Sequence, residues 1–184
     1  HTVAAVGHHH GTTSAVTLRQ DMRALWEDHV AWTRMFIVSA VAGLPDTDAT
    51  LDRLLRNQTD IGNAIAVYYG KDAGAKLTDL LRTHIVIAGD IVAGAKAGND
   101  AAVKQASAAW YVNADDIAKF LAAANPAWPE TTLADMMRTH LDQTLAEATA
   151  ELSGDYTAGV AEYDHVVVHI LEMADALASG ITTQ

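Results

Sequence analysis

Cysteine is absent from the sequence, and basic residues are few. The chain of 184 residues has 12 Lys and Arg against 23 Asp and Glu, which gives a formal net charge of −11. Without cysteine the chain has no disulfide, no thiolate metal ligand and no thiol nucleophile. Nucleic acids and anionic lipid surfaces are bound through clusters of Lys and Arg. The scattered basic residues therefore argue against both partners.

Long apolar runs are also missing. The longest, such as those at 35–38 and 166–168, fall far short of the roughly 20 residues that a bilayer requires, so we expect no membrane insertion. The sequence has neither a glycine-rich phosphate loop nor a Ser-His-Asp arrangement. It therefore does not support nucleotide or hydrolase chemistry, and it favours a binding protein over an enzyme.

The first residue is His rather than Met, which indicates either a removed leader or a trimmed chain. An acidic domain that does not depend on disulfides fits an exported protein. On the first interpretation we expect a secreted, periplasmic or cell-surface location.

The sequence is rich in helical periodicity. Residues 1–16 lack it, so we expect a flexible, histidine-containing arm followed by a helical domain at 17–184. In that domain apolar residues recur at steps of three and four, and no window alternates as a strand does. Helix breakers lie at 43–46, 70, 98–100, 125–126 and 153–154. This pattern predicts an all-α fold, an antiparallel bundle of about six helices.

One part of the chain repeats another. Residues 53–85 align without a gap on residues 109–141, and the aligned pairs include Asn, Asp, Arg, Thr and His. A weaker echo of three residues links 28–30 with 164–166. The alignment predicts an internal helix-pair repeat and a pseudo-symmetric bundle in which the first and last helices correspond.

Four segments carry a resemblance to a known family: LWEDHVAWTR at 25–34, NQTDIGNAI at 57–65, NADDIA at 113–118 and NPAW at 125–128. Through them, residues 18–182 resemble a family of uncharacterised bacterial, exported helical-bundle proteins with no established activity. The resemblance implies the extent of the domain and no particular function. In the last helix the family pattern has its histidine at the position of His169, not of His165.

Five histidines fall on helices in positions that suggest a metal site. Heptad spacing places His29, His84 and His140 on buried seams near the middle of three helices. The last helix adds His165 and His169 on one face, which Glu172 continues. Neutral imidazoles on facing helices bind Zn, Cu or Fe, and carboxylates complete such sites. The predicted ligands are His29, His84, His140, His165, His169 and Glu172.

The same residues have other interpretations. A seam histidine can be a core residue bonded to a carboxylate or carbonyl, in a non-catalytic structural or protein-interaction module. A bis-histidine haem site is a third alternative. If the hairpins are symmetric, His84 and His140 are both buried, each facing Asp60 or Asp116 on its partner helix. We expect those two carboxylates to accept from Arg82, Arg138 or an indole N–H in a buried network.

Two further features remain. His1, His8 and His10, with His9 beside them, form a second candidate site, because an N-terminal histidine chelates Cu(II) and neighbouring imidazoles assist. The last helix is apolar on most sides, which fits either a central position or a homodimer face.

Overall fold

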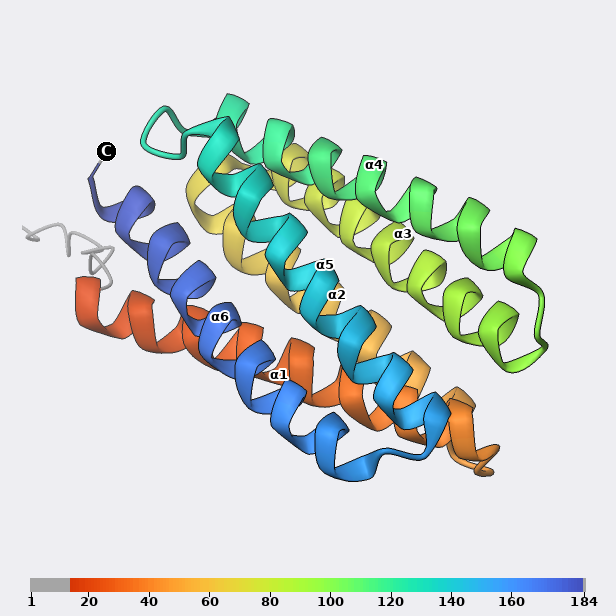
Figure 1. The fold of residues 1–184 in the computed structure, drawn as a ribbon. Helices are drawn as coiled ribbons and strands as arrows, with labels where there is room; N and C mark the ends of the chain where they lie inside the picture. The colour runs from red at the N-terminus through yellow and green to blue at the C-terminus, as the bar shows by residue number, and fades with distance from the viewer. Residues whose placement is uncertain (1–13, 184) are drawn as a thin grey trace, which may run out of the picture.

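The computed structural model describes residues 14–183. Within that range the chain forms six helices and no strand (Figure 1), which confirms the all-α prediction. The helices are α1 (Ala15–Ala42), α2 (Thr47–Tyr69), α3 (Lys71–Lys96), α4 (Asp100–Ala124), α5 (Glu130–Ser153) and α6 (Tyr156–Thr182). None of the described helices is long and apolar enough to cross a membrane.

The helix ends follow from local chemistry. The side chains of Ser14, Asn99 and Asp155 accept hydrogen bonds from backbone N–H groups in the first turns of α1, α4 and α6. Gly43 and Gly154 end α1 and α5 with φ values of 66° and 77°, in the left-handed region that glycine tolerates best. The predicted breakers therefore lie where the helices stop.

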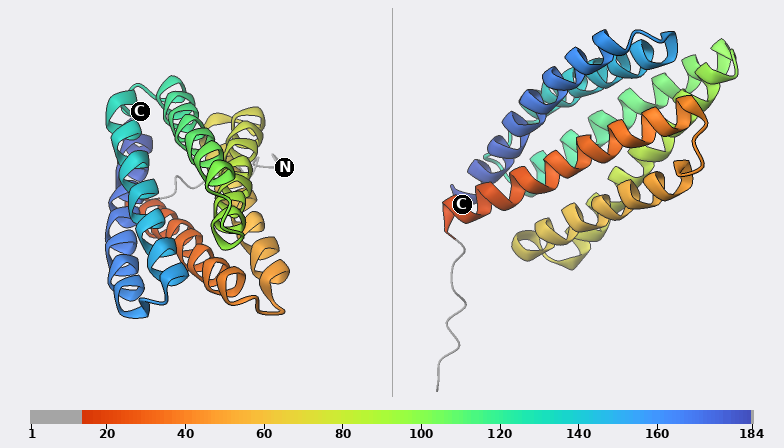
Figure 2. Two further views of the ribbon diagram at one scale, coloured as in Figure 1. Left: turned by 45° about the vertical axis from the view of Figure 1, so that its right-hand side comes forward. Right: turned by 90° about the horizontal axis from the view of Figure 1, so that it is seen from below.

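The six helices form a closed ring. Each helix packs against its neighbours in the chain, and α6 returns to pack against α1. The two views of Figure 2 show α1 beside both α2 and α6. Helices α1, α3 and α5 also contact one another across the middle of the ring. Side chains on the inner faces of these three helices can therefore meet in the core.

Helices α2 and α3 approach each other closely at two glycines. A Cβ atom on Gly62 would lie 1.9 Å from Thr78 Oγ1 and 2.6 Å from the Gly74 carbonyl oxygen. A Cβ on Gly74 would lie 2.5 Å from the Gly62 carbonyl oxygen. Only glycine permits this separation of the two backbones.

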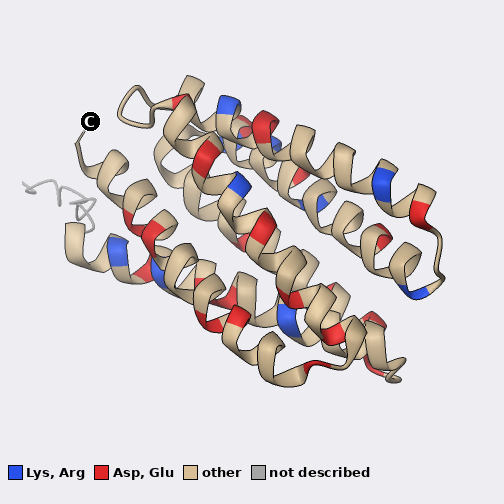
Figure 3. Cartoon of the chain, in the orientation of Figure 1, with Lys and Arg blue, Asp and Glu red and all other residues tan. Residues whose placement is uncertain are grey.

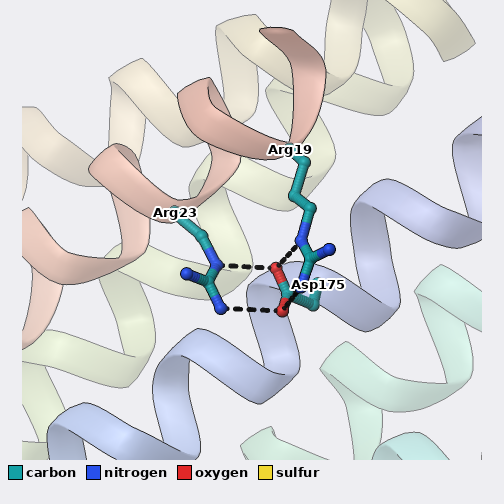
Figure 4. A network of polar contacts seen from close by, with 3 residues as sticks. All are labelled: Arg19, Arg23 and Asp175. Carbon is teal, nitrogen blue, oxygen red and sulfur yellow. Dashed lines mark hydrogen bonds and ion pairs between the residues drawn. The ribbon is translucent and has the colours of Figure 1, made fainter. Parts of the chain in front are cut away.

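Acidic residues lie on all six helices, whereas the Lys and Arg residues lie on α1 to α5 (Figure 3). Ion pairs tie neighbouring helices together. Arg19 and Arg23 of α1 both donate to the carboxylate of Asp175 on α6 (Figure 4). The two guanidinium groups hold the pKa of Asp175 well below its usual range. Because Arg19 is exposed and Arg23 is half-exposed, water and salt screen this contact.

Candidate functional site

Three histidines from three helices meet in the core. His29 of α1, His84 of α3 and His140 of α5 are 2, 2 and 3% exposed. The ring centroids of His29 and His140 are 5.7 Å apart, and those of His84 and His140 are 6.2 Å apart. The heptad pattern predicted that all three are buried, and this is confirmed. We call these three residues the histidine cluster.

An amide on the next helix fixes the orientation of His84. The Asn113 amide group donates to the Leu80 carbonyl oxygen at 3.1 Å, which directs its own oxygen toward His84. His84 Nδ1 donates to that oxygen at 2.8 Å. The proton of neutral His84 is therefore on Nδ1, and the lone pair of Nε2 is free to accept or to bind a ligand.

His29 of α1 is also contacted by an amide group, which belongs to α2. Asn57 donates to the Leu25 carbonyl oxygen at 3.0 Å, and Gln58 Nε2 lies 3.2 Å from His29 Nδ1. The Gln58 amide group also donates to the Leu54 carbonyl oxygen at 2.8 Å. The contacts of Asn57 with Leu25 and of Gln58 with His29 connect α2 to α1, whereas the bond to Leu54 lies within α2.

His140 lacks such a partner, and its Nδ1 atom is buried without a hydrogen bond. In α6, His169 Nε2 donates to the Met136 carbonyl oxygen at 2.8 Å. This bond matches those of Asn57 and Asn113, because each reaches the carbonyl four residues before a histidine of the cluster. His169 thus stands where the other helix pairs have asparagine, and His140 receives no amide.

This side-chain bond to a backbone carbonyl joins α2 to α1, α4 to α3 and α6 to α5. Asn57 and Asn113 are aligned positions of the segments 53–85 and 109–141, and each bonds to the helix before its own. The helix-pair repeat itself stays a prediction. Asp60 is only half-buried and Asp116 is exposed. No hydrogen bond in residues 14–183 joins either carboxylate to the cluster, and Arg138 pairs with Asp115 instead. The expected Asp60 and Asp116 network is therefore wrong, and the buried amides take its place.

Burial keeps the three imidazoles neutral. It lowers the pKa of His29 to about 4 and the pKa of His84 to about 3. The pKa of His140 falls well below 6.5, through burial first and then through the neighbouring His29 and His84. Desolvation disfavours the charged ring. All three lone pairs are consequently unprotonated at neutral pH, which is the state that a metal ligand needs.

Two tryptophans enclose the cluster. The Trp26 ring meets His29 edge-on with centroids 5.5 Å apart, and the Trp110 ring lies 5.0 Å from that of His84. Both indole Nε1 atoms are buried without a partner, and so is Gln58 Oε1. Together with His140 Nδ1, unsatisfied polar atoms thus gather around the cluster. Such atoms are uncommon in native cores and call for a specific cause, such as a bound water or ion.

The other predicted ligands lie elsewhere. His169 is mostly buried beside α5, where it bonds to the Met136 carbonyl. The side chains of His165 and Glu172 are 65 and 66% exposed, and His165 pairs with Glu162 at 3.3 Å. The structure does not bring His165 or Glu172 to the cluster. His1, His8, His9 and His10 lie outside the described residues.

The structure contains a second buried polar group that the sequence did not predict. Arg34 of α1 donates to Glu147 Oε1 at 2.8 Å, and Glu147 is almost fully buried. Burial raises the pKa of Glu147. Glu147 Oε2 and Glu151 Oε2 are buried without a hydrogen bond. Glu147 and Glu151 lie one turn apart on α5. This spacing is also common on exposed helix faces, so the sequence does not indicate that the two carboxylates are buried.

As the side chains stand, no group of three or more His, Cys, Asp or Glu residues in 14–183 has its donor atoms placed to hold a metal ion. Occupation of the cluster would therefore require the rings to turn. A small apolar cavity of about 30 Å³ adjoins it, with Thr33, Ala88, Trp110 and Thr144 among its walls.

No protein-family model matches the chain, and no curated protein and no solved structure is significantly similar to it. The resemblance of residues 18–182 to uncharacterised bacterial proteins stays a prediction. The function must be argued from the site alone.

Proposed function

We propose that the histidine cluster binds one transition-metal ion through ring nitrogens of His29, His84 and His140. The observation that carries the proposal is the meeting of three neutral imidazoles from three helices, one of which has a buried nitrogen without a partner. On a tetrahedral ion with metal–nitrogen distances of about 2.0–2.1 Å, two imidazole rings have centroids roughly 5 Å apart. The His29–His140 and His84–His140 separations of 5.7 and 6.2 Å exceed this by about 1 Å. We propose that metal binding turns the rings and draws His29 and His84 toward His140.

The contact between His84 and Asn113 supports the same proposal. Histidines that bind metals usually donate their second ring N–H to a carbonyl or carboxylate oxygen, which fixes the tautomer. His84 Nδ1 makes such a bond to the Asn113 amide oxygen at 2.8 Å. His84 Nε2 is then the nitrogen available to the ion.

The ligand chemistry narrows the choice of ion. Three imidazoles without thiolate or carboxylate suit Zn, Cu or Fe and do not suit Mg or Ca, which prefer oxygen. The adjoining cavity of about 30 Å³ is far smaller than a porphyrin, which favours a bare ion over haem. Among residues 14–183 no Asp or Glu side chain is hydrogen-bonded to the three imidazoles. We propose storage, transport or sensing of the metal in an exported protein.

The test is calorimetric titration of the untagged protein with Zn²⁺ and with Cu²⁺. We expect a single core site with a Kd below about 10 μM, weakened at least 100-fold in the His84→Leu, His140→Leu variant. A His165→Leu variant serves as the surface control. A variant with His1, His8, His9 and His10 replaced by alanine separates binding by the arm.

Circular dichroism verifies that the double variant keeps its helices. The proposal is wrong if the core binds no metal more tightly than about 10 μM. It is also wrong if the folded double variant binds as the wild type does.

A structural or protein-interaction module is the second candidate function. The bonds from Asn57 and Asn113 to carbonyl oxygens of the preceding helix favour it, because buried polar contacts of this kind can specify helix register. On this alternative the same double variant folds and loses no ligand.

A further inference from the structure

The cavity beside the histidine cluster has walls supplied by equivalent turns of the three inner helices. Thr33, Ala88 and Thr144 each lie four residues after a histidine of the cluster, on α1, α3 and α5. One turn of helix advances about 5.4 Å along the axis. Trp110 lines the cavity and also packs against His84 with ring centroids 5.0 Å apart. The cavity is therefore the next layer of the core, in direct continuity with the cluster.

The walls of this cavity are almost entirely apolar. The hydroxyl groups of Thr33 and Thr144 donate back to the His29 and His140 carbonyl oxygens, at 2.7 and 2.8 Å. The other lining residues include Phe36, Ile85 and Ile91. Water needs two to four polar partners to occupy a cavity, whereas apolar cavities stay dry and accept apolar molecules. The lining thus selects against water.

The size of the cavity limits what can enter. One water-sized probe fills roughly 10–15 Å³, so a cavity of about 30 Å³ has room for roughly two atoms of that size. Organic ligands, nucleotides and haem are all too large.

We propose that this cavity binds a small, neutral, apolar molecule of diatomic size, the class to which dioxygen, nitric oxide and carbon monoxide belong. These molecules dissolve in apolar cavities and coordinate to transition metals. A molecule held there lies about one helical turn from His29, His84 and His140. Its approach to a metal ion in the cluster rests on the proposed function above, whereas its entry into the cavity does not.

Xenon tests the cavity without any metal. The probe is xenon added to the metal-free protein, followed by NMR of the Ile85, Ala88 and Ile91 methyl groups. We expect shifts that saturate with xenon pressure and that are largest at these methyls. An Ala88→Val variant fills the cavity and weakens xenon binding at least tenfold, and Ala148→Val does the same from α5.

The exposed Ala146 of α5 provides a matched control, because Ala146→Val makes the same chemical change away from the cavity. This variant should bind xenon as the wild type does. The cavity proposal is overturned if the wild type shows no saturable shift. It is overturned equally if the cavity-filling variants, folded by circular dichroism, bind xenon unchanged.

Carbon monoxide tests the link to the metal. The Cu(I)-loaded protein under carbon monoxide should show an infrared C–O stretching band that Ala88→Val removes or shifts. If xenon binds but the core takes up no metal, the proposed function fails and the cavity site stands. If metal binds but xenon does not, the cavity site fails and the metal site stands. If both bind and no band forms, the link between them is wrong.

Discussion

At the scale of single residues, His140 is the member of the cluster with an incomplete environment. His84 donates to Asn113, and His29 contacts Gln58, but His140 Nδ1 has no partner. The reason is the identity of residue 169, where α6 has histidine in the place that asparagine occupies on α2 and α4. An imidazole that donates to a carbonyl through Nε2 has no amide oxygen to offer His140.

We predict that His169→Asn supplies this missing partner. The new amide should donate to the Met136 carbonyl oxygen and accept from His140 Nδ1, which would raise the free energy of unfolding by about 1 kcal/mol. His169→Ala, the control, should lower it by about 1–2 kcal/mol, since it removes the buried side-chain hydrogen bond to the Met136 carbonyl. Urea unfolding measures both. Equal losses in the two variants would show that residues 169 and 113 are not equivalent.

At the scale of helices, close packing of α2 on α3 depends on the absence of side chains at their crossing. Gly62 and Gly74 face each other there, and each excludes a Cβ on the other. Gly89, on the same helix as Gly74, has a different setting. A Cβ at Gly89 would lie 3.7 Å from Phe36, which is an ordinary contact.

We predict opposite effects of the same substitution at these sites. Gly62→Ala should lower the free energy of unfolding by about 1–3 kcal/mol, because the helices must move apart. Gly89→Ala should raise it by about 0.5–1 kcal/mol, because alanine favours the helix and the space exists. Thermal unfolding by calorimetry compares the two. A stabilised Gly62→Ala variant would contradict the close approach.

The helices and their inward faces were predictable because they depend on local signals. Caps and glycines set the ends, and the 3.6-residue period placed His29, His84 and His140 on the seams. Partners across helices were not predictable, because they depend on which helices adjoin. The partner of His84, Asn113, lies 29 positions later in the sequence and on another helix. Helix α6 lies outside the aligned segments 53–85 and 109–141, so the alignment did not predict that His169 replaces asparagine in the α5–α6 pair.

The buried face of α6 was likewise not predictable from the sequence. His165 and His169 are four residues apart, yet one is exposed and the other is mostly buried. The helix packs through Ile170, Met173 and Leu177. Its apolar sequence spreads over most of its circumference, so the period alone could not identify this face.

At the scale of the whole molecule, three buried neutral histidines make stability depend on pH. Their folded pKa values lie below the unfolded value near 6.5, at about 4 for His29 and about 3 for His84. The unfolded chain therefore binds more protons than the native one between these limits. Stability is fully present above pH 6.5 and is lost as pH falls toward 4 and then 3.

We predict a steep acid transition in the metal-free protein. The free energy of unfolding should fall by on the order of 1 kcal/mol per pH unit for each buried histidine below pH 6.5. Glu147, whose pKa is raised, opposes part of this loss, because its carboxyl group takes up a proton more readily when folded. Urea midpoints between pH 7.5 and 4.5 in EDTA give the slope. The His84→Leu, His140→Leu variant should flatten it, and an unchanged slope would contradict the assignment.

The closed ring of helices allows the chain termini to be moved to another loop. Ala15 and Thr182 line one surface pocket, and Arg19 and Arg23 join Asp175 close by. Helix α6 packs against α1 as closely as consecutive helices pack against each other. The end of α6 and the start of α1 could therefore be joined by a loop, as the other neighbouring helices are. The ring is therefore suited to circular permutation. A short linker from α6 to α1, with new termini at the exposed turn around Gly98, would keep every helix contact and the histidine cluster.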